Sequence, residues 1–150
     1  GSPLTYVPYV DPLGRFAFRH PLGWSISGMT TLPLMASGGD AIGFFNVDVG
    51  WAAVPMFSTA DQLAVSVENG IRSNWTGYQR LSYTSSMLAG GYAAQISGTY
   101  LALNGAVIKR TWRFTVRGVN GYWMSAGAPL VIFDHCEADL EAILNSLVIN

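Results

Sequence analysis

The chain has 150 residues, of which half are apolar and only 11% are charged, and its formal net charge is −1. This length fits one domain that buries a core without metal ions, and the single cysteine, Cys136, excludes an internal disulfide. The near-neutral charge argues against nucleic-acid binding through phosphate neutralisation, and no apolar run approaches the roughly 20 residues that span a bilayer.

The first twelve residues are predicted to precede the folded domain. Gly1-Ser2 is typical of residues left by removal of an expression tag. Residues 3–12 carry three prolines and little charge, as expected of an extended lead-in or the end of a linker. Residues 13–150 then form a single domain.

Residues 15–26 predict a short hairpin. Residues 15–19 alternate as a strand, Pro-Leu-Gly at 21–23 indicates a turn, and residues 24–26 resume the strand pattern. The aromatic side chains of both strands are expected on the core side. Residues 27–40, which contain Gly, Ser, Thr and Pro, predict a loop.

The next stretch combines a strand with an apolar loop. Residues 41–49 have strand composition, and Phe45, Val47 and Val49 can line one face. Residues 50–57 then form an apolar loop before a helix. Its aromatic side chains, Trp51 and Phe57, are candidates for the rim of a pocket or an interface.

A helix is predicted to begin near Ser58 or Thr59, because either residue is a good N-cap and Asp61 complements the positive helix end. The apolar stripe that can cover a sheet consists of Leu63, Val67 and Ile71. Residues 78–87 alternate as a strand, and residues 89–91 turn the chain into a meander.

The central strand of this meander is Ala106–Arg117, in which apolar residues at even positions alternate with polar residues at odd positions. Two hairpin signals, Asn104-Gly105 and Asn120-Gly121, flank it. A two-residue loop at residues 104–105 would mix polar and apolar side chains on both faces of the hairpin. Three-residue loops at residues 103–105 and 119–121 instead separate the two kinds of side chain onto opposite faces, so we predict three-residue loops. The expected pairs are Tyr100–Ile108, Ile96–Trp112, Ala94–Phe114, Phe114–Ala126 and Val116–Met124.

This register places charged residues on both faces of the strand. Arg110 lies on the apolar face opposite Gly98, and it needs either a carboxylate, for which Glu68 is a candidate, or a path to solvent. The opposite face carries Lys109, Arg113 and Arg117, with Trp123 beside Arg117. That stripe is either a solvated strand face or a surface for an acidic partner or an aromatic ligand.

Asp134 and Glu137 have capping-box spacing and predict the start of a second helix. Its apolar stripe consists of Cys136, Leu140, Ile143, Leu144 and Leu147. The expected fold class is α+β, with an antiparallel sheet meander flanked by two main helices.

The sequence resembles PsbP-like domains at its opening, where Gly14–Phe18 and then His20–Trp24 match a Phe-x-Phe strand that leads through Pro-x-Gly-Trp. The later order is also similar: a helix, a long meander, a closing helix and a short Ser-x-x-Ile strand at Ser146–Ile149. The resemblance spans nearly the whole chain. It implies an α/β/α sandwich with helices on both sides of the sheet, in a bacterial extracytoplasmic protein that is secreted or anchored through an upstream segment.

No motif in the sequence indicates an enzyme. His20 and His135 are not spaced as a metal pair, and Cys136 falls on an apolar helix stripe as a buried thiol. The sequence contains no nucleophile elbow, phosphate-binding loop or His-Glu-x-x-His helix. We therefore predict no catalytic residue, no cofactor and no metal site.

These patterns favour a non-catalytic, extracytoplasmic accessory or binding domain that docks a partner protein or an apolar ligand. Two alternatives stay open: a small α+β enzyme that uses His20 or Asp48 as acid or base, and a structural interaction module of a larger envelope protein. The candidate partner or ligand surface comprises Lys109, Arg113, Arg117, Trp123, Trp51 and Phe57.

Overall fold

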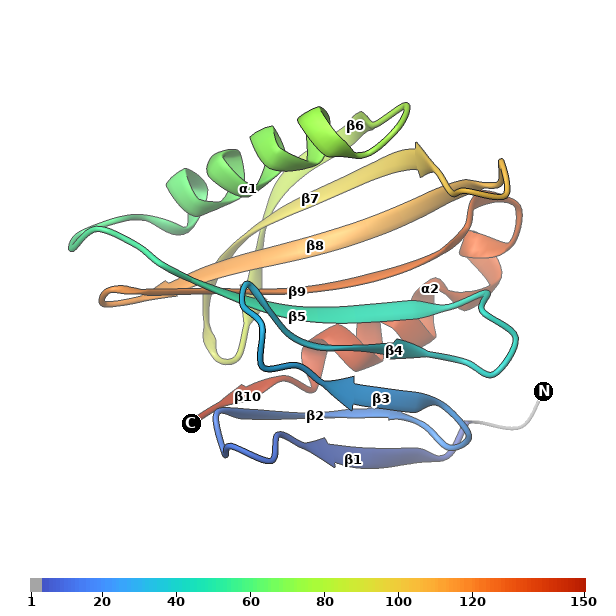
Figure 1. Cartoon of the computed structure of the whole chain (residues 1–150), viewed down its shortest axis with the longest axis horizontal. Coiled ribbons are helices and arrows are strands. Elements are labelled where there is room, and N and C mark those ends of the chain that lie inside the picture. The colour runs from blue at the N-terminus through green and yellow to red at the C-terminus, as the bar shows by residue number, and fades with distance from the viewer. Residues whose placement is uncertain (1–3) are drawn as a thin grey trace.

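The computed structural model describes residues 4–150 and contains two antiparallel sheets and two helices (Figure 1). Gly1-Ser2, with its predicted tag origin, lies outside the described residues. The strands are β1 (Tyr6–Val10), β2 (Phe16–Pro21), β3 (Ser25–Gly28), β4 (Leu34–Gly39), β5 (Asn46–Ala53), β6 (Gln79–Leu88), β7 (Gly91–Leu101), β8 (Val107–Arg117), β9 (Asn120–Pro129) and β10 (Val148–Ile149). The helices are α1 (Ala60–Asn74) and α2 (Leu130–Asn145).

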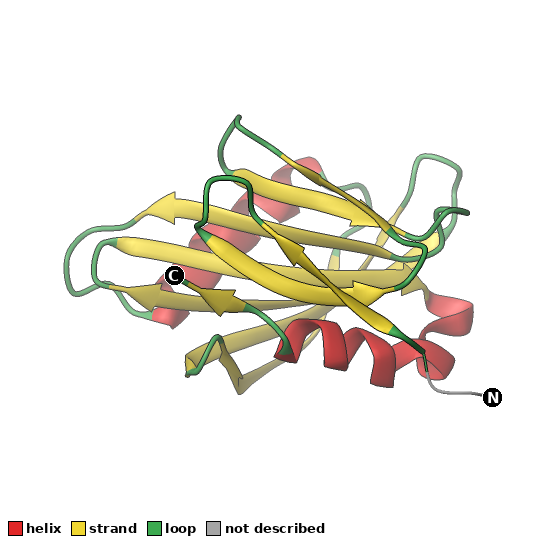
Figure 2. Ribbon diagram, turned by 90° about the horizontal axis from the view of Figure 1, so that it is seen from below, coloured by secondary structure: helices red, strands yellow, loops and turns green. Residues whose placement is uncertain are grey.

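The larger sheet has the strand order β3-β4-β5-β9-β8-β7-β6, and the smaller sheet has the order β1-β2-β10. One side of the larger sheet packs against α1, where Leu63 and Ile71 join Trp112 and Phe114 in one buried cluster. The other side packs against α2, and the two helices lie on different sides of the strands (Figure 2). The predicted α+β sandwich is confirmed. Within residues 4–150, neither helix is long and apolar enough to cross a membrane.

The predicted pairing of β7 with β8 is confirmed. A loop with Gly105 at φ +85° joins the two strands, as the face-sorting argument requires. The observed pairs include Ala94–Phe114, Ile96–Trp112, Gly98–Arg110 and Tyr100–Ile108.

The predicted pairing of β8 with β9 is wrong. Phe114 lies opposite Trp123, and Arg117 lies opposite Asn120, so the loop contains only Gly118 and Val119. Gly118 has φ +61°, which suits the first position of a two-residue hairpin loop. The turn therefore forms at Gly118-Val119 and not at the Asn120-Gly121 pair that follows. The shift moves every side chain of β9 to the other face.

Trp123 therefore lies on the α1 side with Trp112, not beside Arg117 on the opposite side. Gly50 in the neighbouring strand makes room for the Trp123 ring, because a Cβ at that position would clash with the indole. Met124 and Ala126 turn toward α2 instead. Both faces of β8 and β9 are consequently covered.

The N-terminal third differs from the prediction in how its strands pair. The lead-in contains β1, which pairs with β2, and the buried Asp11 accepts a 2.6 Å hydrogen bond from Arg15 Nε, so this segment belongs to the fold. The predicted hairpin does not form, since β2 and β3 enter different sheets. The expected core positions of Phe16 and Phe18 are confirmed.

Three element boundaries also differ. The loop predicted over residues 27–40 contains β4, and β5 extends to Ala53, into the predicted apolar loop. Helix α2 begins at Leu130, directly after β9, rather than near Asp134. Because neighbouring strands supply their hydrogen-bond partners, β4 and the end of β5 form without a strong local pattern.

The start of α1 agrees with the prediction. Thr59 is the N-cap, and its side chain and that of Gln62 form a reciprocal capping box. Further along α1, Glu68 is buried and accepts hydrogen bonds from Arg80 Nη2 at 2.5 Å and from the Tyr78 hydroxyl at 2.7 Å. The Arg80 hydrogen bonds hold the pKa of the Glu68 carboxyl below its ordinary value.

Replacing Trp112 by Ala should lower the free energy of unfolding by about 3–5 kcal/mol, because this ring is 2% exposed between α1 and the sheet. Denaturant unfolding measures the change, and Leu22→Ala, at a 70% exposed side chain, is the control. A loss below about 1 kcal/mol at Trp112 would show that this face is not covered.

Glu68→Gln should destabilise the protein at neutral pH and much less in acid. Since the folded pKa of Glu68 is lowered, its stabilising contribution is present above the unfolded carboxyl pKa of about 4.3 and is lost as the pH falls through the folded pKa. The measurement is the unfolding free energy of both proteins between about pH 7 and pH 3. A difference that stays constant over this range would contradict the assigned ion pairs.

Candidate functional site

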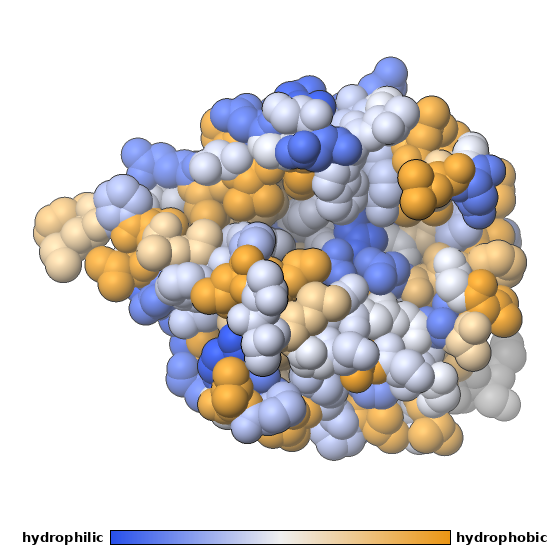
Figure 3. All heavy atoms as spheres, viewed as in Figure 1, coloured by the Kyte–Doolittle hydropathy of each residue, from blue (hydrophilic) through white to orange (hydrophobic). Residues whose placement is uncertain are grey.

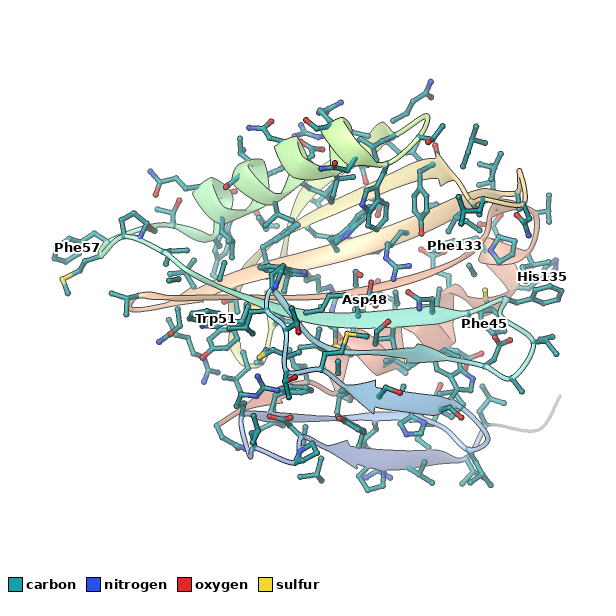
Figure 4. The ribbon with its side chains drawn as sticks, viewed as in Figure 1. Phe45, Asp48, Trp51, Phe57, Phe133 and His135 are labelled. Carbon is teal, nitrogen blue, oxygen red and sulfur yellow. The ribbon has the colours of Figure 1, made fainter. Side chains whose placement is uncertain are left out.

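The loop between β5 and α1 presents the most exposed aromatic side chain of the predicted surface. Phe57 is 91% exposed and Met56 is 67% exposed. Figure 4 shows Phe57 at the tip of this loop, pointing away from the body of the domain, and Figure 3 shows the hydrophobic side chains of the protruding loop. The φ angle of Phe57 is +66°, which is unfavourable for a bulky side chain.

Hydrogen bonds hold this loop in place. The Ser58 hydroxyl donates to the Pro55 carbonyl at 2.5 Å, and the Ser58 backbone N–H donates to the same carbonyl at 3.1 Å. The Val54 N–H donates to the carbonyl of Val119 at 3.0 Å. The loop is therefore a defined turn that orients Phe57 outward.

A groove of about 490 Å³ lies between this loop and α1. Apolar side chains form most of its wall, among them Val54, Met56, Phe57, Leu63 and Val67. This size is within the range of sites that take a small molecule or the side chains of a partner protein. Its chemistry suits an apolar occupant.

Trp51 does not share this groove. Its indole Nε1 donates to Asn120 Oδ1 at 3.0 Å, and its ring lines a separate cavity of about 180 Å³ with Met35 and Tyr122. The structure therefore separates the two aromatic residues that the sequence placed in one apolar loop.

Helix α2 covers the predicted stripe of cations at Arg113 and contacts Lys109, whereas Arg117 is exposed. Arg113 is 5% exposed, and its Nη2 lies 2.5 Å from Glu141 Oε2 of that helix. The Lys109 ammonium lies 4.5 Å from the centre of the Phe133 ring. Arg117 donates to the carbonyl of Ala89 at 2.6 Å. Arg113 is therefore neither solvated nor part of an open surface, while Lys109 stays half-buried and Arg117 exposed.

Arg110 is bonded to Asp48 and not to the predicted partner Glu68. The guanidinium is 1% exposed and lies 3.1 Å from Asp48 Oδ2. It also donates to Asn46 and, at 2.9 Å, to the Ser125 hydroxyl. Gly127 leaves the space across which this side chain reaches from β8 to β5, because a Cβ there would crowd the guanidinium.

The Arg110–Asp48 pair lines a pocket of about 290 Å³, between the end of α1 and the β7–β8 loop. Trp75 and Tyr100 also line this pocket. Hydrophilic residues are visible in the hollow between α1 and β5 (Figure 3), and Asp48 lies on β5 in the same view (Figure 4). Sequence reasoning missed this pocket, although the buried Arg110 pointed to it.

The residues considered for acid–base chemistry are dispersed. The carboxylate of Asp48 accepts hydrogen bonds from Arg110 and, at 2.6 Å, from the Ser37 hydroxyl. His20 lies in β2 of the smaller sheet and His135 is exposed on α2, so neither lines the Asp48 pocket. Cys136 is buried, as predicted, and burial raises the pKa of its thiol.

Asp48→Ala should lower the free energy of unfolding by about 3 kcal/mol, since it leaves the Arg110 charge buried without a carboxylate. Arg110→Met in addition should cost less than the sum of the two single changes. A double-mutant cycle measures this coupling, and Asp134→Ala, at an exposed carboxylate, is the control. Additivity within about 0.5 kcal/mol would show that the pair does not interact.

Comparisons with known proteins find similarity in structure and not in sequence. No family model and no curated protein matches the sequence. Cyanobacterial PsbP from Synechocystis sp. PCC 6803 superposes with a TM-score of 0.73 at 12% identity, over 99% of this chain and 95% of that one. LpqN, involved in cell envelope biogenesis of Mycobacterium tuberculosis, gives 0.68 at 15% identity, over 99% of this chain and 92% of that one.

The Ran-binding protein Mog1p of Saccharomyces cerevisiae gives a TM-score of 0.65 at 10% identity, over 98% of this chain and 96% of that one. These three structures cover almost the whole domain, including both helices and the meander. At such low identity they establish the architecture alone. The chain has the PsbP-like fold.

Proposed function

We propose that this domain is a non-catalytic binding module that docks a partner protein through the β5–α1 loop. The observation that carries the proposal is the exposed Phe57, held outward in a left-handed backbone conformation. An aromatic ring in water gains nothing for folding, and the positive φ adds strain of order 1–2 kcal/mol. A partner with an apolar recess compensates both, because it removes the ring from water.

The surroundings of Phe57 support a protein partner. Met56 beside it is also exposed, and the apolar groove under the loop offers a recess to side chains of the partner. Aromatic anchors with complementary pockets dominate the energetics of protein interfaces. The loop and its groove thus supply both halves of such a contact.

Proteins of the same fold support a binding role. Mog1p is a Ran-binding protein, which shows that this architecture serves protein recognition elsewhere. LpqN takes part in cell envelope biogenesis, and on this similarity we propose that the present domain works outside the bacterial cytoplasm. The role remains that of an accessory domain.

A second candidate occupant of the same groove is an apolar small molecule. The groove has a volume of about 490 Å³ and mostly apolar walls, and both properties suit such a molecule as well. Native mass spectrometry of the purified protein distinguishes the two occupants. A bound apolar ligand appears as a defined mass increment, whereas a protein partner leaves the mass of the purified domain unchanged.

Replacing Phe57 by a photo-crosslinking phenylalanine analogue should trap the partner in the producing cell. The matched control carries the analogue at Val65, a 47% exposed residue of α1. The expected result is one protein adduct at position 57 that is absent or at least about tenfold weaker at position 65. Equal labelling at both positions would contradict a dedicated contact at the loop.

Phe57→Gly separates binding from folding. Glycine adopts positive φ without strain, so the free energy of unfolding should stay unchanged or rise by up to about 1 kcal/mol. In a pull-down without crosslinking, this variant should capture less of the partner identified by crosslinking, by about tenfold or more, as expected when an aromatic anchor is lost. Undiminished capture, or a large loss of stability, would show that Phe57 serves the fold instead.

A further inference from the structure

Strand β6 is an edge strand of the larger sheet. It pairs with β7 on one side, and no strand within residues 4–150 pairs with its other side. The strand has ten residues, most of them exposed. Its outer N–H and C=O groups form a template for another strand.

The other edges of the two sheets carry the features that prevent pairing. Strand β3 has four residues, β10 has two, and β1 contains Pro8. Short edges and prolines block the addition of a further strand. Strand β6 has neither feature, and its one irregularity lies near its start, where the register shifts between Arg80 and Ser82. The regular segment from Ser82 to Leu88 is therefore the exception among these edges.

Charge does not protect β6 either. Its one charged residue, Arg80, is turned to α1, where Nη2 lies 2.5 Å from Glu68 Oε1. The segment from Ser82 to Leu88 has no charged residue and no proline. No charge and no proline in this stretch therefore opposes pairing with a further strand.

We propose that β6 pairs antiparallel with β6 of a second copy of this chain, about a two-fold axis at Thr84. In this register Ser82 lies opposite Ser86 of the second copy, and Tyr83 lies opposite its Ser85. Met87 is 56% exposed in the single chain, and the pairing places it beside Leu81 of the second copy, a 54% exposed residue at the irregularity of β6. The hydroxyl-bearing residues between them carry no charge that opposes contact.

The assembly closes at two copies. A two-fold contact uses the same strand on both chains, so no further β6 edge is left to extend the sheet. The remaining edges are short or contain proline, which disfavours open-ended growth. The resulting sheet is continuous through both chains, and the Phe57 loop plays no part in the contact.

Charge variants at the axis test this pairing. Thr84 is exposed, so Thr84→Lys and Thr84→Glu should both fold. Each should weaken self-association by about tenfold or more, because identical charges then face each other across the axis. An equimolar mixture of the two variants should restore a heterodimer, in which opposite charges meet.

Sedimentation or light scattering over a concentration series measures the assembly. Ser27→Lys, an exposed serine on the short edge strand β3, is the control and should dimerise as the unchanged protein does. The proposal is overturned if the unchanged protein stays monomeric throughout the series. It is also overturned if both Thr84 variants dimerise normally, or if their mixture stays monomeric.

Discussion

Two buried arginines on neighbouring parts of β8 determine how this domain is built. Arg110 and Arg113 are 1% and 5% exposed, and they point to opposite faces of the same strand. A buried guanidinium must meet a carboxylate and further acceptors, since an uncompensated charge is costly. Asp48 on β5 meets the first and Glu141 on α2 meets the second, so the two ion pairs link β8 to its surroundings on both sides.

With both faces of the central strands covered, exposed features suited to binding lie at the periphery. The β5–α1 loop extends beyond one end of the larger sheet, and β6 forms the outer edge of that sheet (Figure 1). A rigid scaffold that presents loops for recognition is a common division of labour in proteins. The predicted stripe of Lys109, Arg113 and Arg117 stabilises the fold instead, because each of these cations contacts a group of the same chain.

Sequence reasoning succeeded where local pattern and long-range packing agree. The alternation in β8 predicted the β7–β8 register, and Thr59 marked the start of α1. It failed at β9, whose Ser125–Ala128 segment is small and buried on both faces, so no alternation reveals its register. Arg113 could not be recognised as buried because its partner Glu141 is 28 residues away, on a helix whose position the sequence does not specify. The Asp48 pocket depends on a similar distant pairing.

Amide hydrogen exchange along β8 is the most direct test of a strand covered on both faces. The amides of residues 109–116 should be among the slowest to exchange, because opening them requires the loss of both helix contacts. Amides of the Phe57 loop should exchange orders of magnitude faster. Exchange in β8 as fast as in the β5–α1 loop would contradict the account, since it would mean that the two ion pairs do not secure the sheet.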